Sequence, residues 1–189
     1  IAVEAGDLVV LGSTIATNGC GLRGGGIVSV APLSSVYVAN TTISGNIAQT
    51  GGGGVYSADN LNLRNVTLVQ NDTATNGGGV HIEAGAPIVI NTIAAGNTNN
   101  GGDSDIACGN VNLTVSRNNI IGNGGSGGML DGINSNQIGV SPAIVYNATL
   151  ADNGGTTLTH ALLGGSPAIN AGSNGNATDH EGNPLIFDQ

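Results

Sequence analysis

A repeated pattern of asparagines and glycines constrains this chain more than any other feature. Each copy is an apolar stretch that is closed by an asparagine and followed by a glycine cluster. The closing asparagines are Asn18, Asn46, Asn71, Asn97 and Asn123, at intervals of 28, 25, 26 and 26 residues. The residues after the glycine clusters keep the same intervals: Ile27, Val55, Val80 and Ile106. A fixed period of this length is typical of a solenoid, a propeller or a repeat array.

The pattern inside each repeat indicates short strands. Apolar residues alternate or occur in short runs, many are β-branched, and Gly, Asn or Asp separates them. Each repeat offers three apolar positions, which fits a three-sided coil better than a four-stranded blade. Stacked coils place equivalent residues about 4.8 Å apart. We therefore expect three inward columns: Val10, Val38, Leu63 and Val89; Ile15, Ile43, Leu68 and Ala94; and Ile27, Val55, Val80 and Ile106.

These observations predict an all-β fold, a three-sided parallel β-solenoid with about 26 residues per coil, which gives roughly seven turns for this length. The glycine clusters are suited to sharp corners, because glycine adopts positive φ without steric cost. Asparagine also tolerates this conformation, and stacked asparagines form hydrogen-bonded ladders. Two such structural ladders are predicted: Asn18, Asn46, Asn71 and Asn97, and Asn40, Asn65 and Asn91.

The repeat divides the chain into two parts of one domain. Residues 1–128 hold the regular coils, whereas residues 129–189 contain no clear copy of the pattern and end in a segment rich in Pro, Gly and Asn. We expect this second part to form irregular coils that cap the last regular one, since terminal repeats of solenoids are usually atypical.

Two resemblances follow from these motifs. The repeats resemble right-handed parallel β-helices of the pectate-lyase-like superfamily. Residues 150–172, LADNGGTTLTHALLGGSPAINAG, resemble the C-terminal motif of bacterial choice-of-anchor Q domain proteins. That resemblance implies an extracellular or cell-surface location in a bacterium and a β-helix, but no reaction. His160 lies in this motif and is expected to serve packing rather than catalysis.

Charge and cysteine content exclude several classes of protein. The net charge is −9, and the only strong bases are Arg23, Arg64 and Arg117. A basic nucleic-acid footprint is therefore absent. No apolar stretch is long enough to cross a membrane. Cys20 and Cys108 are separated by three coils, roughly 14 Å, which exceeds the reach of a disulfide.

The sequence shows no constellation of catalytic residues. Polysaccharide lyases of the related superfamily need a basic proton abstractor beside acidic residues that hold calcium, and hydrolases need paired carboxylates. Arg64 and Arg117 each precede an asparagine but lie two coils apart, and the twelve acidic residues are scattered singly. We predict no catalytic residues and no enzyme activity, with a polysaccharide lyase or hydrolase as the alternative.

Candidate binding residues are few. Tyr56 and His81 should point outward on neighbouring coils, as an exposed surface pair or as a shelf that contacts carbohydrate. Asp103 and Asp105, spaced i and i+2, are either a solvated turn or Ca²⁺ ligands. Asp179, Glu181 and Asp188 present the same choice. No cofactor is expected apart from this Ca²⁺.

Three functions remain open at this stage. The chain is a structural or filament-forming module, a carbohydrate-binding adhesin, or a polysaccharide-degrading enzyme. Only three tyrosines and one phenylalanine are available as stacking platforms for sugars, which disfavours the last two. We therefore predict a secreted or cell-surface structural or adhesive protein, with end-to-end self-association and surface glycans as the partners to test. End-to-end association would make filaments, because head-to-tail contacts continue unless their rotation closes a ring.

Overall fold

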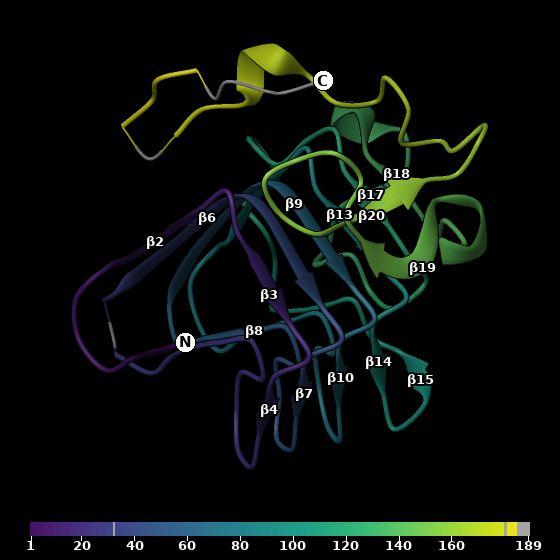
Figure 1. The fold of residues 1–189 in the computed structure, drawn as a ribbon. Helices are drawn as coiled ribbons and strands as arrows, with labels where there is room; N and C mark the ends of the chain where they lie inside the picture. Colours follow the sequence, from purple (N-terminus) through teal and green to yellow (C-terminus); the bar gives the residue numbers. More distant parts are fainter. Residues whose placement is uncertain (32, 180, 185–189) are drawn as a thin grey trace.

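A computed structural model describes residues 1–31, 33–179 and 181–184. The predicted all-β solenoid is confirmed: parallel coils about 26 residues apart are stacked on one another. The stack has about 5 turns rather than the seven expected from length, because the C-terminal part of the chain leaves the coil path. Figure 1 shows the coils one behind another, with the C-terminal segment lying across their side.

Three sheets run along the stack. Sheet A contains β1 (Ala2–Val3), β5 (Ile27–Ser29), β8 (Val55–Ser57), β11 (Val80–Ile82) and β16 (Ile106–Ala107). Sheet B contains β2 (Leu8–Leu11), β3 (Thr14–Ala16), β6 (Ser35–Ser44), β9 (Asn60–Val69), β12 (Ile88–Ile90), β13 (Ile93–Ala95), β17 (Ile120–Ile121) and β18 (Gln137–Ile138). Sheet C contains β4 (Gly19–Cys20), β7 (Ile47–Ala48), β10 (Asp72–Thr73), β14 (Thr98–Asn99) and β15 (Gly102–Asp103).

Sheet B carries two of the three apolar columns. It bends within β6 and β9 at Asn40 and Asn65, which adopt φ of 49° and 53°. In β9 the alternation of buried and less buried residues restarts after the bend. The three predicted columns are confirmed, because each member pairs in register with its neighbour, as in Val38↔Leu63 and Val55↔Val80. All twelve predicted core residues are buried in one continuous cluster. The short strands of sheet C and the loops beside them form an additional row that the sequence did not predict (Figure 1).

The C-terminal end of the stack is closed by local features. β15 turns back and pairs antiparallel with β14, which ends sheet C. Met129 is 3 % exposed and joins the core cluster, where its Sδ lies 3.5 Å from Asn119 Nδ2. The 3₁₀ turn η1 (Ile133–Ser135) leads into β18, which pairs with β17 and is the last strand of sheet B.

After β18 the chain leaves the coil path. It passes through η2 (Pro142–Ile144) and the antiparallel hairpin of β19 (Tyr146–Ala151) and β20 (Thr159–Leu162). Residues 163–179 and 181–184, which include η3 (Asn174–Asn176), then run back along the outer face of sheet B; we call them the strap. The expected capping segment thus divides, with residues 129–138 extending the stack and the strap covering its side. Figure 1 shows the strap in yellow.

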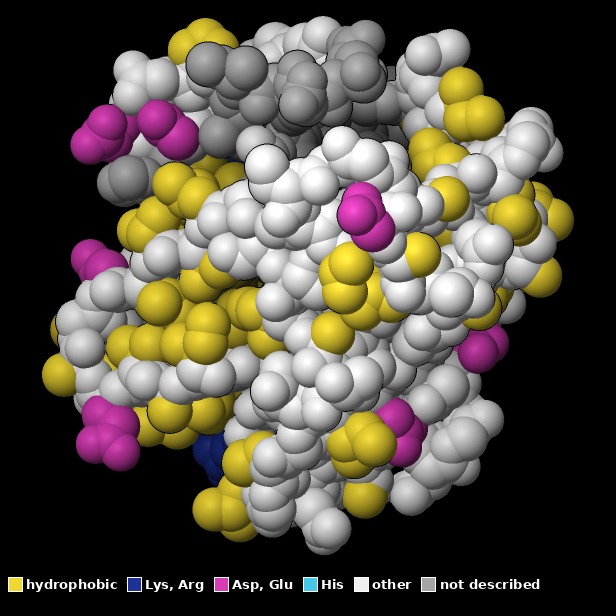
Figure 2. All heavy atoms as spheres, viewed as in Figure 1, with side chains coloured by type: hydrophobic (Ala, Val, Ile, Leu, Met, Phe, Trp, Pro, Cys, Tyr) yellow, Lys and Arg dark blue, Asp and Glu magenta, His cyan; other side chains and the backbone are white. Residues whose placement is uncertain are grey.

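The first coil presents apolar side chains at the other end. Val9 and Leu11 of β2 are 41 % and 45 % exposed. In Figure 2, hydrophobic side chains gather in the area that β2, β3 and the N-terminus surround in Figure 1. Most acidic side chains on this face are scattered singly, and two lie next to each other at the upper left (Figure 2). Within the described residues, no helix is long and apolar enough to span a membrane.

Candidate functional site

The first amide ladder lies inside the corner before sheet C. Asn18 Nδ2 donates to Asn46 Oδ1, Asn46 Nδ2 to Asn71 Oδ1, and Asn71 Nδ2 to Asn97 Oδ1, each over 2.9 Å. Each acceptor oxygen also takes the backbone N–H of the preceding ladder asparagine. Asn46, Asn71 and Asn97 are fully buried. The structure thus brings all four predicted residues together in one directional chain of hydrogen bonds.

The second ladder lies on the outer side of the bend in sheet B. Asn65 Nδ2 donates to Asn40 Oδ1 over 3.0 Å, and Asn91 Nδ2 donates to Asn65 Oδ1 over 2.9 Å. All three asparagines have positive φ, near 50°, which their side chains tolerate better than most. The sequence missed a further pair in the last coils, where Asn119 Nδ2 donates to Asn136 Oδ1 over 2.9 Å.

Asp105 ends the first ladder. Its Oδ1 accepts hydrogen bonds from the backbone N and the Nδ2 of Asn97, at 3.1 and 2.9 Å, and its Oδ2 accepts one from Gly124 N at 3.0 Å. The side chain is almost fully buried, whereas Asp103 is exposed on the β14–β15 hairpin. Desolvation raises the pKa of Asp105, against the lowering effect of these hydrogen bonds. The two carboxylates considered as Ca²⁺ ligands therefore lie in different environments.

A signal for Asp105 existed in the sequence. It precedes Ile106 as Gly54 precedes Val55 and Gly79 precedes Val80, so it stands in a glycine column. A Cβ at Gly54 or Gly79 would lie about 3 Å from the side chain of a ladder asparagine. A carboxylate at this position therefore points into the ladder itself.

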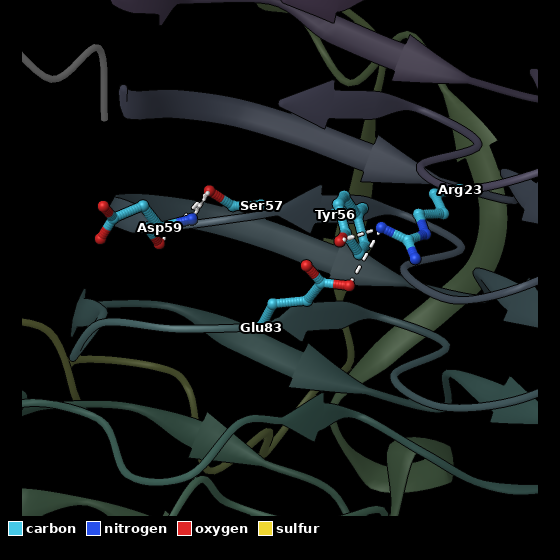
Figure 3. Close-up of polar contacts among 5 residues, drawn as sticks. All are labelled: Arg23, Tyr56, Ser57, Asp59 and Glu83. Carbon is cyan, nitrogen blue, oxygen red and sulfur yellow. Dashed lines mark hydrogen bonds and ion pairs between the residues drawn. The ribbon is translucent and has the colours of Figure 1, made fainter. Parts of the chain in front are cut away.

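Tyr56 and His81 form a cluster with Arg23 and Glu83 on the outer face of sheet A. The two rings stack with centroids 5.5 Å apart and planes 5° apart. Figure 3 shows the Arg23 guanidinium beside Tyr56, with its Nη1 bonded to the phenol oxygen at 2.5 Å and to Glu83 Oε1 at 3.0 Å. The guanidinium carbon is 4.8 Å from the ring centroid, which adds a cation–π contact.

The predicted exposed pair is therefore wrong for Tyr56. Its side chain points outward from the coil, but it is only 1 % exposed because Arg23, His81 and Glu83 surround it. Desolvation, followed by the hydrogen bond to Glu83, raises the pKa of Tyr56 to about 12. Desolvation also lowers the pKa of His81, whose buried Nδ1 has no hydrogen-bond partner among the described residues. A sugar could reach this shelf only after the Arg23–Glu83 pair moved.

Arg64 and Arg117, the bases considered for a lyase, both bind main-chain carbonyls. Arg64 Nη1 donates to Asn176 O of the strap over 3.0 Å, and its Nε donates to Asn62 Oδ1. Arg117 donates to Val115 O and Thr114 O within its own coil. Arg23, by contrast, forms an ion pair with Glu83. Arg64 and Arg117 therefore act mainly as hydrogen-bond donors to the backbone.

A cavity of about 510 Å³ lies where the strap meets the first three coils. Asp7, Tyr37 and Arg64 line it from the coils, and Asp179 and Glu181 line it from the strap. Desolvation raises the pKa of Tyr37, an effect that nearby Arg64 opposes and Asp179 reinforces. The sequence could not indicate this grouping, because it joins residues more than 100 positions apart without any repeat.

The carboxylate of Asp179 is occupied by its own turn. It accepts hydrogen bonds from the backbone N–H groups of Glu181 and Asn183 and from Asn183 Nδ2. Asp188, the third acidic residue considered with them, lies outside the described residues. No group of three or more metal-ligating side chains occurs within the described part of the chain.

A second groove, of about 570 Å³, lies under the middle of the strap. Its floor includes Thr67, Asn91 and Asn118 of the coils, and its far wall includes Leu162 and Ser173. None of its lining residues is charged. The groove can therefore accept a neutral molecule with hydrogen-bonding groups.

His160 connects two parts of the fold, and the two cysteines are not bonded to each other. His160 Nε2 lies 2.8 Å from Ser44 Oγ, and its Nδ1 lies 2.8 Å from Asn147 O, so it joins the hairpin to sheet B. Its ring packs edge-on against Tyr146. Cys20 and Cys108 are both free thiols.

Comparison with known protein families, with characterised proteins and with solved structures finds no match to this chain.

Proposed function

We propose that this chain is a structural or adhesive β-solenoid module of a secreted or cell-surface bacterial protein. One observation carries the proposal: the polar side chains that could act in catalysis form hydrogen bonds that stabilise the coils and the strap. The ladder asparagines bond to one another, Asp105 closes their ladder, and Arg64 and Arg117 bond main-chain carbonyls. The resemblances to pectate-lyase-like β-helices and to choice-of-anchor Q proteins support a role outside the cell.

End-to-end association belongs to this proposal. Strands β2 and β4 are the first strands of sheets B and C, and each is paired on one side only within the described chain. Such an edge accepts a further strand through main-chain hydrogen bonds. The added coil would come from a longer form of the same chain or from a second copy.

Two measurements test the structural proposal. Antibody labelling of intact source cells should detect the protein on the surface or in the medium. Electron microscopy with light scattering over a range of concentrations should show rods or fibres that lengthen with concentration. A protein confined to the cell interior would refute the location, and a monomer at high concentration would refute end-to-end association.

A polysaccharide lyase or hydrolase is the second candidate. The observation that favours it is the cavity in which Tyr37 and Arg64 meet the carboxylates of Asp7, Asp179 and Glu181. In glycan cleavage a phenol can act as an acid, a carboxylate as a base and a guanidinium as a stabiliser of negative charge. Incubation with pectins, alginates and other acidic glycans tests it. Turnover that is lost in Arg64→Ala and retained in Arg117→Ala would replace the structural proposal with this one.

Glycan binding without cleavage is the adhesive version of the first proposal. The uncharged groove under the strap supports it, since its amide and hydroxyl groups match the hydrogen-bonding needs of neutral sugars. A glycan array probed with the labelled protein tests this version. Binding that Asn118→Ala removes would place the sugar in this groove.

A further inference from the structure

The strap is held to sheet B by one side-chain donor from each of five neighbouring levels. Each donor bonds a main-chain carbonyl of the strap, and the strap crosses the levels in order, from the last coil back to the second. The pairs are Gln137 Nε2 to Pro167 O (3.2 Å), Asn118 Nδ2 to Ala171 O (3.1 Å), Asn91 Nδ2 to Ser173 O (2.9 Å), Arg64 Nη1 to Asn176 O (3.0 Å), and Tyr37 OH to Thr178 O.

The strap itself is folded by local contacts. Beyond Leu163, whose N–H bonds Val145 O before the hairpin, its backbone–backbone hydrogen bonds join residues three or four positions apart, as in Ser166 N to Leu163 O and Asn176 N to Ser173 O. Within the described strap, residues 163–179 and 181–184, no strand pairs with a coil. Undocking would therefore break side-chain contacts without opening any β-ladder.

Small apolar contacts complete the docked state. Ala177 is fully buried, and Ala168 and Ala171 pack against a cluster that contains Ile120 and Tyr146. The strap begins with a hinge, Gly164–Gly165, where both residues are exposed and an added Cβ would meet no atom within 4 Å. The strap is thus a separately folded segment joined to its dock by an unhindered hinge.

We propose that the outer face of sheet B, defined by Tyr37, Arg64, Asn91, Asn118 and Gln137, is a docking track for a polypeptide segment. Its occupant in a monomer is the chain's own strap. Its partner in an assembly is the strap of a second copy, which docks in the same way and joins two solenoids side by side.

A second copy is the expected partner because each molecule already contains two complementary parts, the track and the strap. Every copy carries both the track and a segment that fits it at five levels, so exchange creates no new interface and restores all contacts in both copies. The five donors bond main-chain carbonyls, which any polypeptide offers. A competing segment must therefore also place its carbonyls at the spacing of the donors. This assembly is independent of end-to-end stacking and of cell-surface location, because it uses the side of the solenoid.

Cleavage of the hinge tests the track. A site for a specific protease is inserted between Gly164 and Gly165 in the full chain, and the folded protein is cut. We expect the cut piece to stay bound in native mass spectrometry, and a fluorescent peptide of residues 165–184 to displace it. Arg64→Ala should weaken peptide binding about tenfold, since it removes a hydrogen bond from a charged donor.

Arg117→Ala is the matched control for peptide binding. This arginine bonds carbonyls of its own coil, so its removal should leave peptide affinity unchanged. The track is refuted if the cut protein unfolds, if the peptide fails to bind, or if the two arginine variants bind it equally.

Shortening of the hinge tests the exchange. Deletion of Gly164 and Gly165 should prevent the strap from reaching its own track. At one low concentration it should therefore double the particle mass in light scattering relative to the parent chain, since short hinges favour swapping. Deletion of Gly154 and Gly155, in the exposed turn between β19 and β20, is the control and should leave the particle mass of the parent chain unchanged at that concentration. Two differently tagged copies of the hinge variant, refolded together, should co-purify. A hinge variant with the same particle mass as the parent chain would refute the exchange.

Discussion

Replacement of Asn71 by alanine tests the contribution of the buried ladder. The side chain accepts hydrogen bonds from the backbone N and the Nδ2 of Asn46, at 3.0 and 2.9 Å. It donates to Asn97 Oδ1 at 2.9 Å and to the carbonyls of Ile43 and Val69 at 3.0 Å. The two hydrogens of Nδ2 thus serve three acceptors, and alanine removes all of these contacts at a position that is fully buried.

The cost can be estimated from the groups that lose every partner. The backbone N–H of Asn46 is left without an acceptor, which costs about 1–3 kcal/mol. Two other groups keep a partner: Asn46 Nδ2 still donates to Ile15 O, and Val69 O still accepts from Gly45 N. With about 1 kcal/mol for each remaining bond and a small cavity, we expect Asn71→Ala to lower the free energy of unfolding by about 3–5 kcal/mol.

Urea unfolding followed by circular dichroism measures this loss. Asn18→Ala is the control, because Asn18 occupies the exposed start of the same ladder, where water can replace its bonds. Its loss should be about 1 kcal/mol or less. Hydrogen exchange at the amide of Asn46 should accelerate in Asn71→Ala only. Equal losses for the two variants, or a loss below about 1 kcal/mol for Asn71→Ala, would show that the ladder does not stabilise the stack.

Three further predictions concern the core, a corner and the buried acid. Val80→Asp places a charge at a core position that is 1 % exposed and should prevent stable folding. Tyr56→Ser removes a stacked and buried ring and should lower the free energy of unfolding by about 2–4 kcal/mol, as measured in a thermal melt. Gly53→Ala puts a Cβ 2.3 Å from Asp72 O and should cost about 1–3 kcal/mol in urea unfolding, whereas Gly19→Ala meets no atom within 4 Å and should cost less. Because the pKa of Asp105 is raised in the folded state, its protonation stabilises the fold; this stabilisation is complete below the ordinary value of 3.8 and is lost as the pH rises through the raised pKa. The stability of Asp105→Asn relative to the parent chain should therefore increase between pH 3 and pH 7, and a difference independent of pH would contradict this reasoning.

The sequence determined the solenoid because its signals repeat in register. Each core residue has an equivalent about 26 positions away, and in a parallel stack that equivalent is its direct neighbour. The same arithmetic predicted both asparagine ladders, whose bonds join residues 25 to 28 positions apart. Asp105 also occupies a position of the repeat, in a glycine column, although from the sequence we assigned its carboxylate to a solvated turn or to Ca²⁺ binding.

The tertiary structure decided what covers the coils. In the strap, Thr178 bonds Tyr37 across 141 positions and Asn176 bonds Arg64 across 112 positions. Neither separation corresponds to the period of the repeat. The burial of Tyr56 also depended on where the long side chain of Arg23 comes to rest, 33 positions away. Such contacts arise once per molecule and depend on the path of a single segment through space, so no period in the sequence encodes them. The coil stack could be predicted because it repeats a local rule, whereas its covering, which forms both cavities beside the strap, required the folded chain.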